Sequence, residues 1–334
     1  MEKDTVEAGA GGGSDQDEVE SVGEKDALSP ESRPLQPTAR RAREHIINVL
    51  CVLLNTVSTV ALVFVNKIIF DDVQLRKMQM SFATWHFTCT ALVLWVACHR
   101  PFHLFEPVRL PVIRMLPLCC FFAGFLVLNN LSLAYNSVGF YQLAKIMTTP
   151  TVVLLNFLLS GITITVMRAV SLIAVCCGVA LVNGASAGSN LTGAAIAALA
   201  FTVTALYQVW IGKKIQDFKV SSSQLLMNQA PIGALLLALL VPFLDTVADL
   251  RTVPASTLVA LFFSGLTASI LNLSQFLIIG RMSALTFNVT SNLKTVIIVS
   301  LGWFHEGKIL LVQDVVGVLL AIGGVAYYTH LSRT

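Results

Sequence analysis

Residues Ile46–Phe70 read IINVLCVLLNTVSTVALVFVNKIIF, with one charged side chain, Lys67, close to the end. A helix of about 20 mostly apolar residues is long enough to cross the hydrocarbon core of a bilayer. Inside that core only a helix or a closed barrel satisfies the backbone polar groups. The apolar run is continuous and does not alternate with polar residues, which favours a helix over a barrel strand. This stretch therefore predicts a membrane-spanning helix.

Further apolar runs of similar length follow along the chain. The composition agrees with a membrane protein, because 55% of the residues are hydrophobic and only 12% are charged, against about 25% charged in soluble domains. Mean hydropathy is +0.75. The predicted spans are 46–70, 80–98, 112–134, 138–159, 169–183, 191–212, 224–244, 256–279, 284–304 and 311–330. We therefore predict an all-α integral membrane protein with ten transmembrane helices.

The first 45 residues differ from the rest in composition. They contain eleven of the nineteen acids, a glycine-rich run and no aromatic residue, so they cannot bury enough apolar surface to fold. They match neither a secretory signal nor a plastid transit peptide, so the first span is expected to act as the targeting signal. We predict a disordered acidic tail over residues 1–45 and a transporter domain over residues 46–331.

The distribution of Lys and Arg between the loops predicts the orientation. With ten spans both termini lie on one side, and that side collects twelve Lys and Arg residues against five on the other. Short basic loops remain cytoplasmic. Both termini are therefore predicted to be cytoplasmic.

Two halves of the chain show internal similarity. Residues 169–180 align with residues 315–326 at a constant offset, and the same offset pairs Lys67 with Lys213. Many transporters consist of two inverted repeats with the substrate site between them. We predict a 5+5 inverted repeat, with halves at residues 46–184 and 191–331.

Two lysines lie deep inside predicted spans. Lys145 follows the start of the fourth span by about 12 Å of helical rise, and Lys294 is near the middle of the ninth. A charge at the bilayer centre costs roughly 2.5–3.5 kcal/mol on insertion scales, so neither lysine is expected to face lipid.

An ion pair or a snorkelling side chain is the alternative explanation for each lysine. All eight acids beyond residue 45 fall in loops or at span ends, so none lies at the depth of Lys145 or Lys294. Two buried cations without a protein counter-ion indicate that the ligand supplies the negative charge, as phosphate does.

Polar residues share the helical faces of the two lysines, because positions three or four apart are neighbours. Local bonds of Thr and Ser to their own helix are the alternative role. Pro150 is expected to bend the fourth helix. The candidate substrate-binding residues are Lys145, Lys294, Thr295, Tyr141, Gln142, Thr148, Thr149, Ser291, Asn292 and, at the start of the seventh span, Asn228, although membrane amides also serve as packing contacts.

Other classes of function find no support in the sequence. There is no His-Glu-x-x-His, no phosphate-binding loop and no pair of intramembrane aspartates. The seven cysteines fall in apolar runs without a metal-ligand spacing. A proton-coupled exporter of cationic drugs needs a membrane carboxylate. We expect no enzyme activity, no metal or other cofactor, and no nucleic acid partner.

Four motifs carry a family resemblance. They are NLSL at residues 130–133, GFYQLAKIMTTP at 139–150, LYQVW at 206–210, and QLL with QAP within 224–231. The chain resembles solute carrier family 35, subfamily E, among the nucleotide-sugar and triose-phosphate translocators of the drug/metabolite superfamily. The resemblance covers residues 46–331 and implies ten helices, antiport by alternating access, and lysines of the fourth and ninth helices, here Lys145 and Lys294, that hold phosphate.

The residue after the second lysine bears on the substrate. Plastid phosphate translocators have Lys-Arg there, a nucleotide-sugar group has Lys-Thr, and this chain has Lys294-Thr295. The resemblance implies exchange of a cytosolic nucleotide sugar, UDP-linked, for lumenal nucleoside monophosphate in the Golgi or endoplasmic reticulum membrane. GDP-mannose is disfavoured, because TSNLK replaces GALNK. A sugar-phosphate or other organic-anion antiporter is the alternative, a non-transporting scaffold is a third class, and the oligomeric state stays open between monomer and homodimer.

Overall fold

The computed structural model describes residues 37–70, 75–136, 138–183, 191–246, 253–306 and 312–331. Within these ranges the side chains of residues 37–40, 67, 70, 138, 139, 142, 143, 182, 183, 298–306 and 314 are not described. The chain divides into two units, Met1–Arg43 and Glu44–Thr334. Most of the predicted tail lies outside the described residues. The side chain of Lys67 is also not described, so its correspondence with Lys213 in the two repeat halves stays a prediction.

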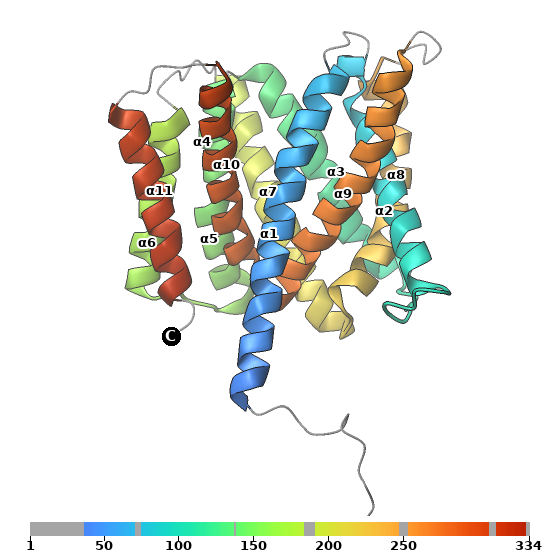
Figure 1. Cartoon of the computed structure of the whole chain (residues 1–334), viewed down its shortest axis with the longest axis horizontal. Coiled ribbons are helices and arrows are strands. Elements are labelled where there is room, and N and C mark those ends of the chain that lie inside the picture. Colours follow the sequence, from blue (N-terminus) through green and yellow to red (C-terminus); the bar gives the residue numbers. More distant parts are fainter. Residues whose placement is uncertain are drawn as a thin grey trace, which may run out of the picture. The chain divides into compact units, whose positions relative to one another are not determined.

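All regular structure in the described ranges is helical (Figure 1). The helices are α1 (Pro37–Phe70), η2 (Leu75–Lys77), α2 (Gln79–Cys98), α3 (Val112–Tyr135), α4 (Val138–Ile146), α5 (Thr148–Ser160), α6 (Val166–Asn183), α7 (Leu191–Phe218), α8 (Ser222–Leu244), α9 (Ala255–Arg281), α10 (Ala284–Glu306) and α11 (Val312–Leu331).

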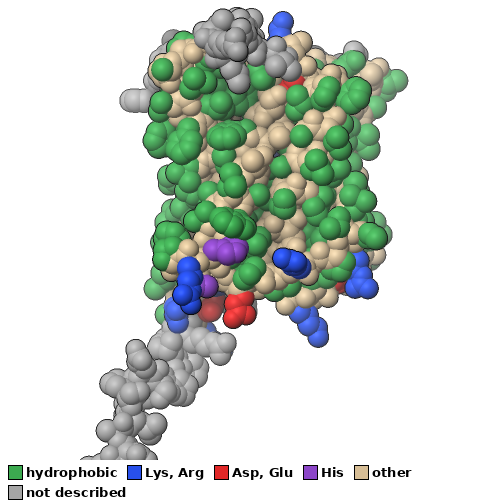
Figure 2. Space-filling model, turned by 90° about the vertical axis from the view of Figure 1, so that its right-hand side faces the viewer, with side chains coloured by type: hydrophobic (Ala, Val, Ile, Leu, Met, Phe, Trp, Pro, Cys, Tyr) green, Lys and Arg blue, Asp and Glu red, His purple; other side chains and the backbone are tan. Residues whose placement is uncertain are grey.

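Six of these helices are long and apolar enough to cross a membrane by themselves, namely α1, α2, α3, α7, α8 and α9. Many of their large apolar side chains are exposed, including Leu50, Trp95 and Leu239. Hydrophobic side chains cover the middle of the face in Figure 2, and most of the charged side chains in that view lie at one end. The prediction of an all-helical, multi-pass membrane protein is confirmed.

The helix bounds differ from the predicted spans by more than three residues in α1 and α7, and one predicted span is divided. α7 continues to Phe218, six residues beyond the predicted end at residue 212. α1 begins at Pro37 and not at Ile46, so the residues just before the first span are helical. The predicted fourth span is divided into α4 and α5 at Met147. The bend expected from Pro150 accounts for this division, because its ring lacks an N–H and clashes with the carbonyl of Ile146, four residues earlier.

α6 and α11 approach each other closely through glycines. A Cβ on Gly178 would lie 2.7 Å from the carbonyl oxygen of Gly317 and 2.5 Å from the nitrogen of Ala321. A Cβ on Gly324 would lie 3.0 Å from the carbonyl oxygen of Ser171 and 2.8 Å from a methyl carbon of Val175. Glycine at both positions therefore allows backbone-to-backbone packing of the two helices.

α3, α7 and α8 pack around an aromatic cluster. The rings of Phe125 and Tyr207 stack with centroids 5.0 Å apart, and Phe122 contacts both. The Tyr207 hydroxyl accepts a 2.8 Å hydrogen bond from Nε2 of Gln229, on α8. These contacts fix the rotation of α7 about its axis. Gln208, the next residue, therefore points to a different side of the helix than Tyr207.

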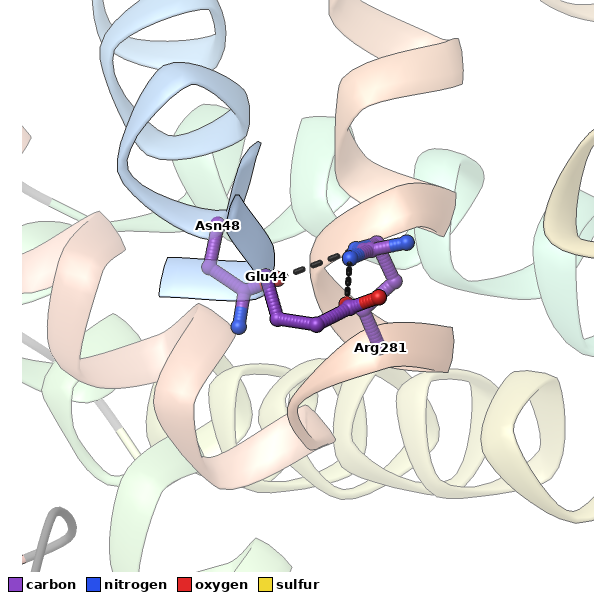
Figure 3. A network of polar contacts seen from close by, with 3 residues as sticks. All are labelled: Glu44, Asn48 and Arg281. Atoms are coloured by element: carbon purple, nitrogen blue, oxygen red, sulfur yellow. Dashed lines mark hydrogen bonds and ion pairs between the residues drawn. The ribbon is translucent and has the colours of Figure 1, made fainter. Parts of the chain in front are cut away.

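Polar contacts close the two ends of the helical unit. At one end, Asp245 at the end of α8 accepts hydrogen bonds from the backbone nitrogens of Met80 and Ser81 at 3.1 and 2.6 Å. At the other end, Arg281 of α9 pairs with Glu44 of α1 and donates from Nε to Oδ1 of Asn48 at 2.9 Å (Figure 3).

Candidate functional site

A small polar pocket of about 30 Å³ lies among α4, α5, α6, α7 and α10. Five of the predicted site residues line it, namely Lys145, Thr148, Ser291, Asn292 and Thr295. They come from two segments that are far apart in the sequence. The structure thus brings the polar faces of the predicted fourth and ninth spans to one place.

Lys294 is buried, with 5% of its surface exposed. Its Nζ donates hydrogen bonds to Oδ1 of Asn55 at 2.6 Å and to Oγ1 of Thr59 at 3.3 Å. The same nitrogen lies 5.2 Å from the ring centre of Phe287, within the range of a cation–π contact. The lysine on α10 is therefore held mainly by α1.

Asn55 is itself anchored to α9. Its Nδ2 donates to Oγ of Ser274 at 2.8 Å and to the carbonyl oxygen of Leu271 at 3.3 Å. Because its oxygen is thus turned toward Lys294, one amide joins α1, α9 and α10. All of these partners are neutral, so they satisfy the protons of the ammonium group without cancelling its charge.

Lys145 is exposed on α4 and lines the pocket, whereas Lys294 is not part of the pocket wall and directly precedes the pocket-lining Thr295. The described ion pairs, Lys214 with Asp217 and Arg281 with Glu44, involve neither of these lysines. Among the described residues, the site therefore holds two cations without a carboxylate partner.

A hydrogen bond also connects α5 with α10. Nδ2 of Asn292 donates to Oγ1 of Thr149, which is buried, at 3.1 Å. The Thr295 hydroxyl donates to the carbonyl oxygen of Ser291, in its own helix, at 3.1 Å, and still lines the pocket. Thr149 therefore joins the two helices, while Thr295 remains available at the pocket wall.

Three predicted residues do not belong to this group. Tyr141 is half-buried on α4 and is not part of the pocket wall. The side chain of Gln142 lies outside the described residues. Asn228 lies near the start of α8, where Nδ2 donates to the carbonyl oxygen of Val108 and Oδ1 accepts from the nitrogen of Leu110. It holds the loop before α3 to α8 in this structure.

Five polar residues of the site were not predicted from the sequence. Asn55 and Thr59 hold Lys294, and Thr204, Gln208 and Asn288 line the pocket. Each is a polar residue well inside an apolar helix, and that signal is present in the sequence. Nothing in the sequence shows which of several such residues meet in space, so their distinction from packing amides needs the fold.

The sequence profile of the Triose-phosphate Transporter family matches residues 46–329. Two relatives from Arabidopsis thaliana, named UDP-rhamnose/UDP-galactose transporter 2 and UDP-xylose transporter 2, are each 30% identical to this chain. Their alignments cover 83% of this chain and 80% and 79% of the two relatives. These matches confirm the resemblance inferred from the four sequence motifs.

A solved crystal structure of another protein shares the fold. It superposes with a TM-score of 0.68 at 16% sequence identity, covering 88% of this chain and 99% of the other. The family profile extends over all the helices that carry the pocket and over both lysines. The chain therefore belongs to the Triose-phosphate Transporter family.

Proposed function

We propose that this protein transports a nucleotide sugar, of the UDP-linked class, in exchange for a nucleoside monophosphate. The names of the 30% identical relatives, which are UDP-sugar transporters, support this substrate class. The proposed location is the Golgi or endoplasmic reticulum membrane, with both termini in the cytosol. The carrier would take nucleotide sugar from the cytosol and nucleoside monophosphate from the lumen.

The observation that carries the proposal is a pair of lysines, one in the wall of the polar pocket and one next to it in the chain of α10. Lys145 lines the pocket. Lys294, which directly precedes the pocket-lining Thr295, is buried and, among the described residues, donates only to the neutral oxygens of Asn55 and Thr59. An unneutralised cation in an apolar surrounding is costly. An anion with several oxygens, such as a phosphate or diphosphate group, would supply the missing charge and accept hydrogen bonds from both lysines.

The proposed architecture is ten membrane spans arranged as a 5+5 inverted repeat, with α4 and α5 together forming one span. The packing of α6 on α11 supports it. Gly178 meets Gly317 and Ala321, while Gly324 meets Ser171 and Val175. These residues correspond at the offset that aligns residues 169–180 with 315–326, so each contact has a counterpart in the other direction. Such reciprocity is typical of a two-fold relation.

Alternating access is the proposed mechanism. A pocket of about 30 Å³ is far too small for a nucleotide sugar, so the helices around it have to separate to admit one. A phosphate that binds Lys294 competes with Asn55, which would loosen α1 from α10. Without an anion the two cations repel each other, so the empty carrier resists closure and exchange becomes obligatory.

Sugar-phosphate antiport is the second candidate, because the matching family is named after triose phosphate. Both candidates use the lysine pair for phosphate. They differ in whether the remaining pocket recognises a nucleoside. The residue beside Lys294 is Thr295, which on the resemblance favours the nucleotide-sugar group.

The test measures thermal stabilisation and exchange in proteoliposomes with a panel of nucleoside monophosphates, nucleotide sugars, triose phosphates and inorganic phosphate. Ligand binding to the folded state raises stability by mass action. Lys294→Gln removes the charge but keeps a donor for Asn55, and Lys214→Gln removes a charge that pairs with Asp217 away from the pocket.

We expect one monophosphate and its sugar conjugate to stabilise the wild type and the Lys214→Gln protein, and to be without effect on Lys294→Gln. Response to small phosphates alone would support the second candidate. Wild-type exchange by a folded Lys294→Gln protein would refute the assignment of the site.

A further inference from the structure

Gln208 and Asn288 form an amide pair across the pocket, from α7 and α10. Both side chains are more than nine-tenths buried, with 6% and 5% of their surface exposed. Nδ2 of Asn288 donates a short hydrogen bond to Oε1 of Gln208 and a second one, at 3.0 Å, to the carbonyl oxygen of Ala284. The proposed phosphate chemistry does not use this pair.

The orientation of both amides follows from these bonds. The atom of Asn288 that meets the Ala284 carbonyl has to be the nitrogen, because two oxygens cannot share a hydrogen bond. Its partner on Gln208 is then the oxygen. Nε2 of Gln208 and Oδ1 of Asn288 are left over, and neither has a hydrogen-bond partner among the described residues.

These two atoms belong to pocket-lining side chains and are not among the fully enclosed unsatisfied atoms, which in the described part of the chain are on Asn136, Trp210 and Gln229. They therefore keep contact with the pocket. One is a donor and the other an acceptor. A ligand that fills the pocket covers both atoms, and a buried polar atom without a partner costs about 1–3 kcal/mol, so a ligand that bonds both atoms is favoured over one that does not.

We propose that Gln208 and Asn288 recognise the hydrogen-bonding edge of the nucleobase. This inference rests on the proposed function and names the part of the site that makes the substrate a nucleotide. In uracil the N3–H donates to Oδ1 of Asn288, and the neighbouring carbonyl oxygen accepts from Nε2 of Gln208. A donor beside an acceptor is the pattern that side-chain amides match in base recognition.

The spacing along α10 agrees with a nucleotide. Asn288 precedes Lys294 by six residues, which is about 9 Å of helical rise. Gln208 and Lys145 line the same pocket on the other helices. In a nucleotide the ribose separates the phosphate from the base edge, so one end of the molecule can meet the lysines while the other meets the amides.

The experiment compares three ligands that share the ribose and phosphate: uridine monophosphate, N3-methyluridine monophosphate and ribose 5-phosphate. Their affinities are measured on the purified full-length protein, wild type and variants Gln208→Leu and Asn288→Leu. Asn272→Leu is the matched control, because its amide bonds to Thr90 of α2, between α9 and α2. Ribose 5-phosphate binding reports whether the phosphate end of the site is intact.

We expect wild-type and Asn272→Leu proteins to prefer uridine monophosphate over both other ligands. In the Gln208 and Asn288 variants this preference falls about tenfold, the effect of losing one hydrogen bond in a buried site, while ribose 5-phosphate affinity is unchanged. Gln208→Met is the second variant if the leucine variants do not fold. It keeps the length and nearly the volume of the glutamine side chain and removes its amide without adding a charge to the pocket that Lys145 lines.

The outcomes separate the two proposals. If uridine monophosphate binds and every folded variant keeps its preference over ribose 5-phosphate, the amide pair only joins α7 to α10 and the inference is wrong. If no nucleotide binds and ribose 5-phosphate or triose phosphates do, the proposed nucleotide-sugar function itself fails.

Discussion

Lys294 shows how this protein keeps a cation inside an apolar bundle. Its ammonium group donates to Asn55 and Thr59, and Asn55 is held in turn by Ser274. The arrangement satisfies hydrogen bonds without a counter-charge, which leaves the charge available to an anion. A carboxylate in place of Asn55 would neutralise the lysine and compete with phosphate.

Asn55→Ala should lower the free energy of unfolding by about 1–3 kcal/mol, because it leaves a buried ammonium proton without its 2.6 Å acceptor. The loss should shrink when Lys294 is replaced by Met, since the group that needed the acceptor is then absent. Chemical denaturation of the four proteins of this cycle in detergent measures the coupling.

Asn48→Ala is the control for that cycle, because it removes an amide from a half-buried position on the same helix, away from Lys294. It should change stability by less than Asn55→Ala does. Strictly additive effects of Asn55→Ala and Lys294→Met would contradict the view that the two side chains stabilise each other.

At the scale of elements, the contact of α6 with α11 depends on two glycines. Gly178 and Gly324 face backbone atoms of the other helix, whereas Gly323, next to Gly324 in the chain, faces open space. Small residues that admit close backbone approach are a common source of helix association in membranes. Because the pairs of contacts are reciprocal, both glycines are expected to matter equally.

Gly178→Ala and Gly324→Ala should each destabilise the protein by about 1–3 kcal/mol, since the new Cβ would lie within 3.0 Å of backbone or side-chain atoms. Gly323→Ala should be neutral or stabilise by about 0.5–1 kcal/mol, as alanine does in a helix. Thermal unfolding of the three variants gives the comparison, and equal effects at positions 323 and 324 would count against the packing described.

The division between α4 and α5 places two neighbouring pocket-lining residues, Lys145 and Thr148, on separate helices. Lys145 lies in the last turn of the first and Thr148 begins the second, with Met147 between them. Met147 N donates to the carbonyl oxygen of Ala144 at 3.0 Å, a tighter turn than in an α-helix. Lys145 and Thr148 therefore lie on opposite sides of a break in the helix.

Pro150→Ala should restore a continuous helix, because residue 150 then has an N–H for the carbonyl of Ile146. We expect stability to be unchanged or raised. The rate of exchange should fall severalfold, because in a continuous helix Lys145 points in a different direction relative to α5. Proteoliposome exchange with purified protein tests this. Exchange at the wild-type rate would show that the division is not needed for transport.

For the whole molecule, the ends of the helical unit are held by contacts between distant segments. Arg281, Glu44 and Asn48 join α1 to α9 at the end where α1 begins. Asp245 joins α8 to α2 at the end where α8 finishes. In the proposed transport cycle, the contacts at the two ends have to open alternately, because the site is accessible from one side of the membrane at a time.

Ten spans require that both termini lie on the same side of the membrane. Epitope tags placed before Met1 and after Thr334 should both be accessible to antibody after digitonin, which opens only the plasma membrane. A tag inserted within residues 71–74, between the first two spans, should need full permeabilisation. Termini on opposite sides would exclude ten spans and, with them, the 5+5 repeat.

The sequence by itself determined that this protein lies in a membrane and that its candidate site contains buried positive charge. Continuous apolar runs can satisfy their backbone in a bilayer only as helices, so the all-helical membrane architecture follows from local composition. The cost of a buried charge is equally local, which is why Lys145 and Lys294 stand out among the apolar residues around them. The division of the fourth span close to Pro150 follows from the covalent geometry of one residue.

Only the tertiary structure decided which polar residues meet. Asn55, Gln208 and Asn228 are all amides within or at the ends of apolar helices, yet the first holds Lys294, the second lines the pocket and the third holds a loop. Their roles depend on the rotation and contacts of helices that are far apart in the chain. Periodicity gives the face of each helix but not its neighbour, because lipid and protein interiors are similarly apolar and the same residues suit both.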